Sequence, residues 1–349
     1  MARAARPTSP YILPPEWAPQ ECIWLSWPHR RDLWNGKIKR AQEVFAEIAS
    51  VISRTQMVRI NSTFHHHSNI AKFLVQARAD PNHIDLCDHA NDDVWCRDHG
   101  PLFVKHRETG EVVIGDWRFN GWGKQFAPYD ADDAVPACIE KATGLRRIRR
   151  DFVLEGGAIE MNGAGQLLTT ESVLLNPNRN PHYSRGEVEQ VLRHGLGASQ
   201  VLWLEKGIEG DDTGGHIDDV ARFVSDDHLL VSTEADSGKP NHLRLKENLE
   251  RLKSYRTAGG KRFQLTPLPL PDPQEVPDWR LPVLPASYVN FLIINQAVLV
   301  PQFGNPSKDQ QALEAIRSCF PSREAIGIPC LDLALEGGTI HCISCQQPK

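Results

Sequence analysis

The residue best suited to covalent chemistry is Cys342, which follows two glycines and a histidine in the stretch GGTIHCISCQQP. A cysteine thiolate is a strong nucleophile, and glycines permit the close backbone approach that an active site requires. Thr339, Ile340 and Ile343 predict a short buried strand that would hold the sulfur in place. The alternative is that Cys342 packs as a small hydrophobic residue, as free cysteines usually do. Other reactive groups must therefore converge on this thiol before it counts as a nucleophile.

Carboxylates, a histidine and an amide occur in short motifs elsewhere in the chain. They are Asp98 in WCRDHGP, Glu155 in LEGGA, His216 and Asp218 in GDDTGGHID, and Asn290 in PASYVN. Each also has a structural interpretation when taken alone. Asp98 would form a surface ion pair, Glu155 would cap a helix or lie in a loop, and His216 would belong to a turn.

The elements that must position these residues repeat as strand, turn, strand, helix and strand. In the clearest copy the turn is 162–165, Ser184 and Glu187 form a helix capping box, and apolar residues line one face of the following helix. The five copies share this pattern of elements rather than sequence identity. They occupy 102–153, 156–204, 217–265, 288–328, and a split unit made of 22–52 and 338–345.

Pairing of the two parts of the split unit would close a ring and remove exposed sheet edges. We therefore predict that 1–349 form a single catalytic domain with an α/β fold. Specifically, we predict a five-bladed pseudo-symmetric propeller of ββαβ units, closed by its N- and C-terminal strands. The alternative is an open α/β sheet, although no glycine-rich phosphate loop follows the first strand. Between two units, Pro267–Pro285 contains seven prolines and predicts a long extended loop.

In such a ring the first strand of each unit would begin near a common axis. The reactive residues fall at these equivalent positions, so the fold would gather them into one pocket. Three tryptophans lie near these motifs, namely Trp95, Trp117 and Trp122. They are candidates for the walls of the pocket, and the alternative is that they pack in the core.

Metal binding is a competing interpretation of the same motifs. The histidines at 65–67 are adjacent rather than spaced for chelation, and the single C-x-x-C of Cys342 and Cys345 is a weak zinc signal. A metal-dependent hydrolase would lose activity to chelators, and its ligands would be Asp211, Asp212, His216 and Asp218. We expect neither a metal nor an organic cofactor.

Composition limits the partners and the compartment. The formal charge is −5 and no Lys/Arg block occurs, which argues against nucleic acid and a membrane surface and favours a small cationic substrate. Eight scattered cysteines indicate a reducing compartment, and neither a signal peptide nor a membrane span is visible. We therefore expect a cytoplasmic protein. A homo-oligomer is compatible with these features.

Motifs spread along nearly the whole chain give it a specific resemblance. They are WLSWPHR, DVWCRDHGPLFV, DWRFNGWG, EGGAIEMNGAGQLLTTESVLLNPNRNP, GDDTGGHIDDVARFV, LPASYVNFLIINQAVLVPQFG and IHCISCQQP. With these motifs the sequence resembles the agmatine deiminase family, which is related to bacterial peptidylarginine deiminases and folds as a five-bladed α/β propeller. Two departures are the Glu336-Gly-Gly-Thr lead into the cysteine and Cys345, where Thr or Gln is more usual.

The resemblance implies that Cys342 is the nucleophile and His216 the acid and base. Asp98 and Asp218 would clamp a guanidinium, and Glu155 would orient His216 or share its proton. A guanidinium is a planar fork of donors that suits paired carboxylates, and its charge would assist ionisation of the thiol. The further substrate-binding residues expected are Trp95, Trp122, Asp212 and Asn290, with Asp212 facing the substrate's far amine.

These roles predict hydrolysis of agmatine to N-carbamoylputrescine and ammonia through a covalent amidino-cysteine, a step toward putrescine. The alternatives are deimination of another guanidine, namely free, C-terminal or peptidyl arginine, and a non-catalytic propeller that binds a partner. Free arginine carries a carboxylate, for which the sequence shows no clear basic partner, and Arg97 and Arg179 are the residues left open for that role.

Overall fold

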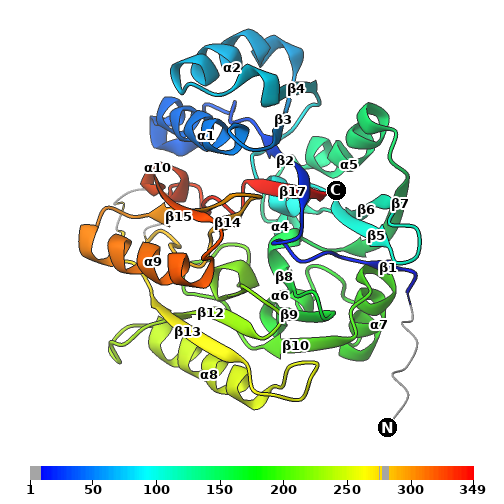
Figure 1. The fold of residues 1–349 in the computed structure, drawn as a ribbon, viewed down its shortest axis with the longest axis vertical. Helices are drawn as coiled ribbons and strands as arrows, with labels where there is room; N and C mark the ends of the chain where they lie inside the picture. The colour runs from blue at the N-terminus through cyan, green and yellow to red at the C-terminus, as the bar shows by residue number, and fades with distance from the viewer. Residues whose placement is uncertain (1–8, 275, 277–282) are drawn as a thin grey trace.

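The computed structural model describes 9–274, 276 and 283–349, and these residues form five separate open sheets with helices on their outer sides (Figure 1). The predicted α/β fold is confirmed at this level. No sheet closes on itself within the described part of the chain, so the finer prediction of a five-bladed propeller is not established by the sheet pairing. All five predicted units contribute a sheet of their own.

Four of the sheets contain a hairpin followed by a helix and a parallel strand. The first has the order β1 (Tyr11–Ile12), β5 (Leu102–His106), β6 (Val112–Arg118) and β7 (Arg147–Val153), with α5 (Asp130–Thr143) before β7. The second has β10 (Gln200–Leu204), β9 (Gln166–Thr170) and β8 (Ile159–Met161), with α7 (Arg185–Leu196). The third has β11 (Ala221–Phe223), β12 (His228–Thr233) and β13 (Gln264–Pro269), with α8 (Asn241–Ser254). The fourth has β14 (Leu292–Ile293), β15 (Ala297–Gln302) and β16 (Glu324–Pro329), with α9 (Pro306–Cys319).

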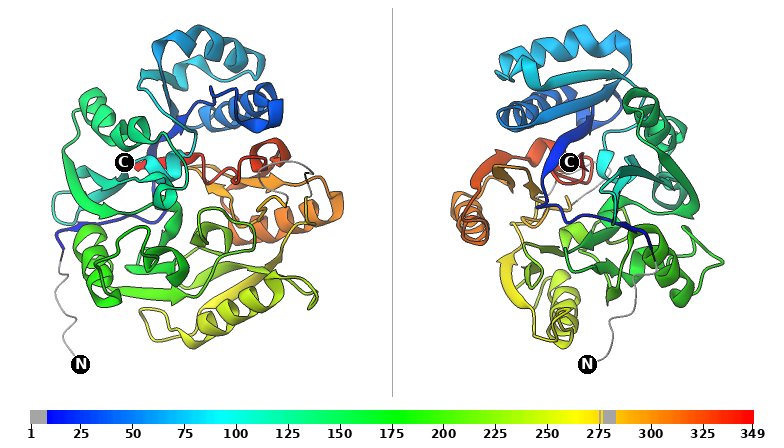
Figure 2. Two further views of the ribbon diagram at one scale, coloured as in Figure 1. Left: turned by 180° about the vertical axis from the view of Figure 1, so that it is seen from behind. Right: turned by 45° about the vertical axis from the view of Figure 1, so that its right-hand side comes forward.

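The fifth sheet joins the two ends of the described chain. Its order is β17 (Ser344–Pro348), β2 (Gln20–Ser26), β3 (Met57–Ser62) and β4 (Ile84–Asp88), with the helices α1 (Ile38–Ser53) and α2 (Phe64–Gln76). As predicted, β17 pairs with β2, and the pairing is antiparallel with Ser344 opposite Leu25. Both views in Figure 2 show the red C-terminal strand beside the blue N-terminal one. The split unit is therefore completed by strands from opposite ends.

One local prediction at this junction is wrong. The expected strand over 338–345 begins only at Ser344, and the residues around Cys342 form turns. Gly337 has a φ of +99°, and the Thr339 hydroxyl and the His341 amide donate to Asn290 Oδ1, at 2.6 and 3.1 Å, rather than to a neighbouring strand. Ile340 and Ile343 are nevertheless fully buried, as expected. Cys342 thus lies on a turn held by side-chain bonds.

Helix signals in the sequence correspond closely to the observed helix ends. Ser184 and Glu187 form the predicted capping box at the start of α7, and Gly197 ends the helix in a left-handed conformation. The predicted apolar stripe of α1 is buried, including Phe45 and Ile52. These helices cover the outer sides of the sheets in Figure 1 and leave the strand ends to surround the middle of the molecule.

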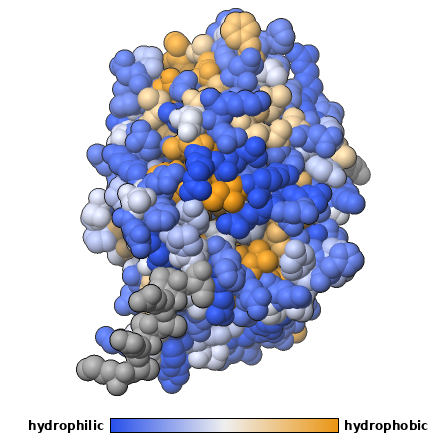
Figure 3. Space-filling view, turned by 90° about the vertical axis from the view of Figure 1, so that its right-hand side faces the viewer, coloured by the Kyte–Doolittle hydropathy of each residue, from blue (hydrophilic) through white to orange (hydrophobic). Residues whose placement is uncertain are grey.

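The surface is largely polar where it is visible. Figure 3 shows a mostly hydrophilic face on which hydrophobic residues occur in small groups. None of the helices in the described ranges is long and apolar enough to cross a membrane. Of the predicted extended loop Pro267–Pro285, Pro267 and Pro269 belong to β13, whereas 275 and 277–282 lie outside the described residues.

Candidate active site

Five of the predicted site residues line one pocket of about 350 Å³. Trp95 and Asp98 come from the short helix α3 (Cys96–His99) and the residue before it, and Trp122 comes from α4 (Gly121–Lys124). Asp212 belongs to the loop after β10, and Cys342 to the turn before β17. The fold therefore brings together segments that are far apart in the sequence, as the equivalent-position argument predicted.

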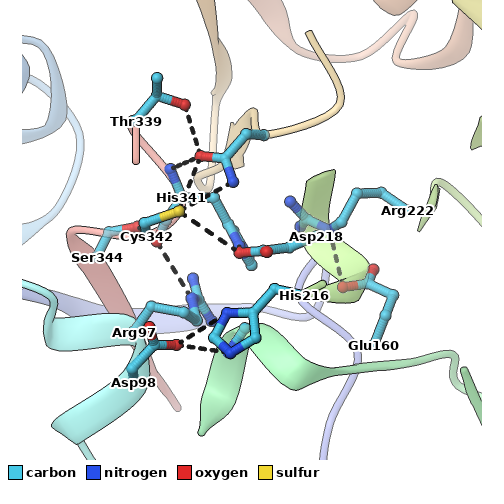
Figure 4. Close-up of polar contacts among 12 residues, drawn as sticks. Arg97, Asp98, Glu160, His216, Asp218, Arg222, Thr339, His341, Cys342 and Ser344 are labelled. Atoms are coloured by element: carbon cyan, nitrogen blue, oxygen red, sulfur yellow. Dashed lines mark hydrogen bonds and ion pairs between the residues drawn. The ribbon is translucent and has the colours of Figure 1, made fainter. Parts of the chain in front are cut away.

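The sulfur of Cys342 lies among acidic and amide groups (Figure 4). Asn290 Nδ2 donates to Sγ at 3.1 Å, and Asp218 Oδ2 lies 3.9 Å from Sγ. The side chain is only 7% exposed. Burial raises the pKa of the Cys342 thiol well above its usual range, and the charges of Asp218, Asp219 and Asp98 raise it further. Without a cation in the pocket, this thiol stays protonated at neutral pH.

Asp98 is fixed by two hydrogen bonds in a buried position. Its Oδ1 accepts from the Gly157 amide and its Oδ2 from Trp122 Nε1, both at 2.9 Å. Burial raises the pKa of Asp98, the charge of His216 opposes that rise, and the charge of Asp218 adds to it. This carboxylate is therefore held rigidly, and it gains from any positive charge that enters the pocket.

Gly157 explains how three reactive groups can meet at one point. A β-carbon at this position would lie 2.5 Å from His216 Nδ1 and 2.9 Å from Asp98 Oδ1. It would also lie 3.1 Å from Asp218 Oδ2. Any other residue at 157 would push these side chains apart, so the glycine is required by close approach.

His216 lies between two carboxylates and is almost completely buried. Its Nδ1 is 3.7 Å from Asp98 Oδ1, and its Nε2 is 4.0 Å from Glu155 Oε2. Burial lowers the pKa of His216, but the charges of Asp98, Asp218 and Glu155 outweigh burial and raise it overall. Within the described residues Nε2 has no hydrogen-bond partner, so this nitrogen is available to a ligand.

Glu155 is anchored on one side only. Its Oε1 accepts from Arg179 Nε at 2.9 Å, and both side chains are fully buried. Its Oε2 has no hydrogen-bond partner in the part of the chain that is described. Arg179 also donates to the Thr213 carbonyl at 2.6 Å, which ties Glu155 to the loop that carries Asp212.

Asp218 is anchored in the same one-sided way. Its Oδ2 accepts from His341 Nδ1 at 2.7 Å, whereas its Oδ1 lacks a hydrogen-bond partner among the residues described. Burial raises the pKa of Asp218, but the hydrogen bond and charge of His341, together with the charge of His216, outweigh burial and lower it overall. Asp218 is therefore an ionised carboxylate with one unused oxygen.

All of the predicted site residues thus lie in one region, although their positions differ. Those in the pocket wall are Trp95, Asp98, Trp122, Asp212 and Cys342. Those behind the wall, in contact with it or with one another, are Glu155, His216, Asp218 and Asn290. Their chemical roles stay predictions.

Several residues of the site were not predicted. Two further acidic residues, Asp93 and Glu336, line the pocket, and Phe126 adds a third aromatic wall. Burial and the charge of Asp132 raise the pKa of Asp93 to about 7. Behind the wall, His341 and Glu16 form a buried chain with Asp218. His341 is adjacent to Cys342 in sequence, and that adjacency was the available signal.

The two arginines proposed as partners for a substrate carboxylate are engaged elsewhere. Arg179 is paired with Glu155, as described above. Arg97 donates to Gln346 Oε1 at 2.6 Å and to the His341 carbonyl at 3.3 Å. Neither lines the pocket, and no Lys or Arg occurs in its described lining.

The four residues of the alternative metal-dependent interpretation are arranged differently from a metal site. Asp211 accepts hydrogen bonds from the His216 amide and from Thr213, so it caps its own loop. Within the described ranges no group of three or more His, Cys, Asp or Glu side chains is placed to hold a metal ion.

Comparison with known proteins identifies close relatives. The family model described as Porphyromonas-type peptidyl-arginine deiminase matches 12–348. An agmatine deiminase from Pseudomonas aeruginosa is 38% identical over 97% of this chain and 95% of its own length. The solved agmatine deiminase of Enterococcus faecalis has a TM-score of 0.91 at 32% identity, covering 100% of this chain and 99% of that one.

A third relative was solved with a ligand. It is an agmatine deiminase from C. jejuni, determined as a cysteine-to-serine variant with substrate bound. Its TM-score is 0.87 at 29% identity, and the match covers 97% of this chain and 96% of that one. The likeness therefore extends over the whole fold.

Proposed function

The chain belongs to the Porphyromonas-type peptidyl-arginine deiminase family, and we propose that it is an agmatine deiminase, which hydrolyses agmatine to N-carbamoylputrescine and ammonia. The observation that carries this proposal is the charge of the pocket. Four of its lining residues are acidic, three are aromatic, and a cysteine thiol faces them. A small dication with a planar guanidinium fits that lining.

The guanidinium end belongs beside Cys342. Asp98 and Asp218 are the carboxylates nearest to the reacting groups, and Asp218 Oδ1 is an unused acceptor there. Trp95 and Trp122 supply flat walls for a planar cation. Bound in this way, the cation offsets the negative charges that raise the pKa of the Cys342 thiol, so substrate binding itself promotes the thiolate.

The far end of the substrate distinguishes agmatine from arginine. Asp212 lines the pocket from the 211–215 loop, and Glu336 is a second acidic residue in the lining. An ammonium is stabilised by these carboxylates, whereas the carboxylate of free arginine would be repelled. With Arg97 and Arg179 occupied by other partners, the pocket favours agmatine over arginine.

The reaction then proceeds in two halves. The thiolate of Cys342 adds to the central guanidinium carbon, forming a C–S bond. The surrounding carboxylates raise the pKa of His216, which favours its protonated form, and this form gives a proton to the departing nitrogen, so the C–N bond breaks and ammonia leaves. The amidino-cysteine that remains is then hydrolysed.

In the second half, neutral His216 removes a proton from water, and the resulting hydroxide adds to the amidino carbon. The C–S bond breaks and the thiolate returns, while the added hydroxyl group loses its proton to solvent and becomes the carbonyl of the ureido product. Glu155 and Asp98 flank the two ring nitrogens of His216, at 4.0 and 3.7 Å, and stabilise its protonated form between the halves.

We also infer that the five sheets are the blades of one pseudo-symmetric propeller. Support comes from the repeated hairpin, helix and parallel strand, from the outer position of the helices in Figure 1, and from the β17–β2 pairing. All eight cysteines are free thiols, which supports a reducing compartment such as the cytoplasm. A homo-oligomer stays a prediction.

The test combines ammonia release with intact-protein mass after rapid quenching. With agmatine, the wild-type protein should release ammonia and carry an adduct of the amidino group's mass, and Cys342→Ala should show neither. Free arginine is the matched competing substrate, and a chelator should leave turnover unchanged. Turnover of arginine but not agmatine would overturn the substrate, and chelator-sensitive turnover without an adduct would overturn the mechanism.

A further inference from the structure

His341 lies beside the nucleophile in sequence, yet the proposed reaction does not use it. Its ring is 1% exposed and each of its nitrogens faces a carboxylate. Nδ1 is 2.7 Å from Asp218 Oδ2, and Nε2 is 2.8 Å from Glu16 Oε2. Figure 4 shows the ring of His341 directed toward Asp218. The arrangement is a continuous chain of polar contacts from Glu16 to the pocket.

Both ring nitrogens of His341 lie within hydrogen-bond distance of a carboxylate oxygen. A ring nitrogen donates to a carboxylate that is ionised. Glu16 is held in its ionised form by its neighbours: burial raises the pKa of Glu16, but the charges of Arg222 and His341 outweigh burial and lower it well below its usual range. His341 therefore bridges two buried carboxylates, those of Glu16 and Asp218.

Glu16 is itself anchored on its other side. Arg222 Nη2 donates to its Oε2 at 2.7 Å, the Ile293 amide donates to its Oε1 at 2.7 Å, and Arg97 Nη2 lies 3.6 Å away. Glu16 therefore cannot rotate freely, and the position of His341 follows from it.

We propose that Glu16 and His341 are positioning residues that hold Asp218 by one oxygen, as an anion, so that its other oxygen stays available to the substrate guanidinium. This inference rests on the proposed function. Oδ1 of Asp218 is buried and has no hydrogen-bond partner in the described chain, which is what a waiting acceptor requires. Without His341, the buried charge of Asp218 would lose its main counter-ion.

The ionisation of Asp218 depends on every charged group around it. His341 and His216 favour its anion, as does the more distant Arg222, whereas burial opposes it. The neighbouring Asp98, Asp219 and Cys342 also respond to its charge. Removing the hydrogen bond and charge supplied by His341 must therefore raise the pKa of Asp218. Protonation of Asp218 would then weaken substrate binding at a higher pH than in the wild-type protein.

Glu16 is suited to a mild substitution. Together with Arg97, Glu160 and His341 it lines a second cavity of about 640 Å³, which Cys342 does not line. Water from this cavity can solvate a changed side chain at 16, so Glu16→Gln removes a charge without leaving a dry void.

The experiment measures agmatine affinity in the Cys342→Ser background, where turnover cannot interfere, from pH 5 to 9. We expect His341→Gln to weaken binding about tenfold or more at neutral pH, because an oriented carboxylate is lost to the guanidinium. The acidic limb of the curve of agmatine affinity against pH should move to higher pH or become steeper in this variant. Glu16→Gln should shift the curve in the same direction by less. With Cys342 intact, KM should rise more than kcat falls.

His89→Gln is the matched control. His89 is also buried, but its Nδ1 bonds to Asn61 and its ring stacks on Trp24. It should lower stability comparably and leave the binding curve unchanged. If His341→Gln lowers the melting temperature but leaves affinity and its pH dependence at the control level, His341 is only structural and the proposal fails.

A second readout does not depend on agmatine. In ¹⁵N-histidine spectra of the wild-type protein, the resonances that disappear in His341→Gln should show hydrogen bonds at both ring nitrogens. Wild type that binds no agmatine while both hydrogen bonds are present would refute the proposed function alone. Absence of the hydrogen bond to Asp218 would refute the positioning proposal alone.

Discussion

Two layers of buried carboxylates, one behind the pocket and one beside it, differ in how they are paired. In the layer behind the pocket, Arg222 donates to Glu160 at 2.8 Å and to Glu16 at 2.7 Å. In the pocket layer, Asp218 and Glu155 each keep one oxygen that has no hydrogen-bond partner among the described residues. The carboxylates of the rear layer are paired with Arg222 of the protein itself. Those of the pocket layer each leave one oxygen for a cation supplied by a ligand.

Because of this difference in pairing, substitutions in the two layers should affect different properties, namely stability for one and activity for the other. Removal of one partner from a buried ion pair is destabilising, so substitutions in the rear layer should lower the free energy of unfolding. A buried carboxylate oxygen that lacks a hydrogen-bond partner is unfavourable in the free protein and becomes favourable when a ligand pairs with it. Substitutions in the pocket layer should therefore change the kinetic parameters.

The largest expected effect is at the nucleophile. Cys342→Ser should lower kcat for agmatine by about four orders of magnitude, since removal of a catalytic nucleophile commonly has that effect. Its melting temperature should stay close to that of the wild-type protein. Ammonia release and thermal denaturation measure the two quantities, and substantial residual turnover would contradict the assignment of Cys342.

Arg222→Met should act mainly on stability. It removes the cation between Glu16 and Glu160, and loss of one partner from a buried ion pair costs about 3–5 kcal/mol of unfolding free energy. Denaturant unfolding measures this loss. Arg118→Met is the matched control, because the Arg118–Asp151 pair is exposed and should contribute little. Equal stability of the two variants would remove the distinction between the layers.

Charge in the pocket should also select among alkylating reagents. We expect cationic 2-chloroacetamidine to modify Cys342 about a hundredfold faster than neutral 2-chloroacetamide, after correction for their rates with a free thiol, because only the cation offsets the surrounding carboxylates. Mass spectrometry with Cys342→Ser as the blank gives both rates. Equal corrected rates would mean that the pocket's negative charge does not act on the thiol.

A smaller effect is expected at the outer part of the pocket. Asp212→Asn removes one negative charge from the lining and should raise KM for agmatine about tenfold, with little change in kcat. Turnover of a guanidine without the terminal amine, such as butylguanidine, should be nearly unaffected. An equal loss for both substrates would place the role of Asp212 elsewhere.

The pH dependence tests the electrostatic link between Asp98 and His216. Carboxylate charges raise the pKa of His216 above its ordinary value of 6.5, so its protonated form persists to higher pH and kcat should fall only as pH rises through that raised pKa. Asp98→Asn removes the strongest of these charges. The pKa of His216 should then fall, and the alkaline limb of the residual activity should move to lower pH. Histidine NMR titration checks the direction independently.

The sequence predicted most of the fold because its signals are local. The turn at 162–165, the capping box at Ser184 and the apolar face of α7 each depend on neighbouring residues, and each was found where expected. The turn at Cys342 was mispredicted as a strand because its bonds to Asn290 come from 49 and 51 residues away. Strand propensity at Ile340 and Ile343 identified burial correctly but not conformation.

The reactive residues of the candidate site could be picked out from the sequence, whereas the residues that support them could not. Cys342, His216 and the carboxylates stand in distinctive motifs at equivalent places in the repeat. Glu16 has no such motif, and its importance arises only from contacts with Arg222 and His341, 206 and 325 residues away. Partners of this kind can be identified only when the chain has been folded.

The β17–β2 pairing has a consequence for the order of folding. Trp24 Nε1 donates to Gln347 Oε1 at 3.0 Å across 323 residues of sequence, and β17 begins two residues after Cys342. Contacts between such distant segments form slowly, because the entropy of closing the intervening loop must be overcome. The thiol therefore reaches its final environment late, after the other sheets can form from local contacts. In a refolding experiment, recovery of activity should lag behind recovery of secondary structure.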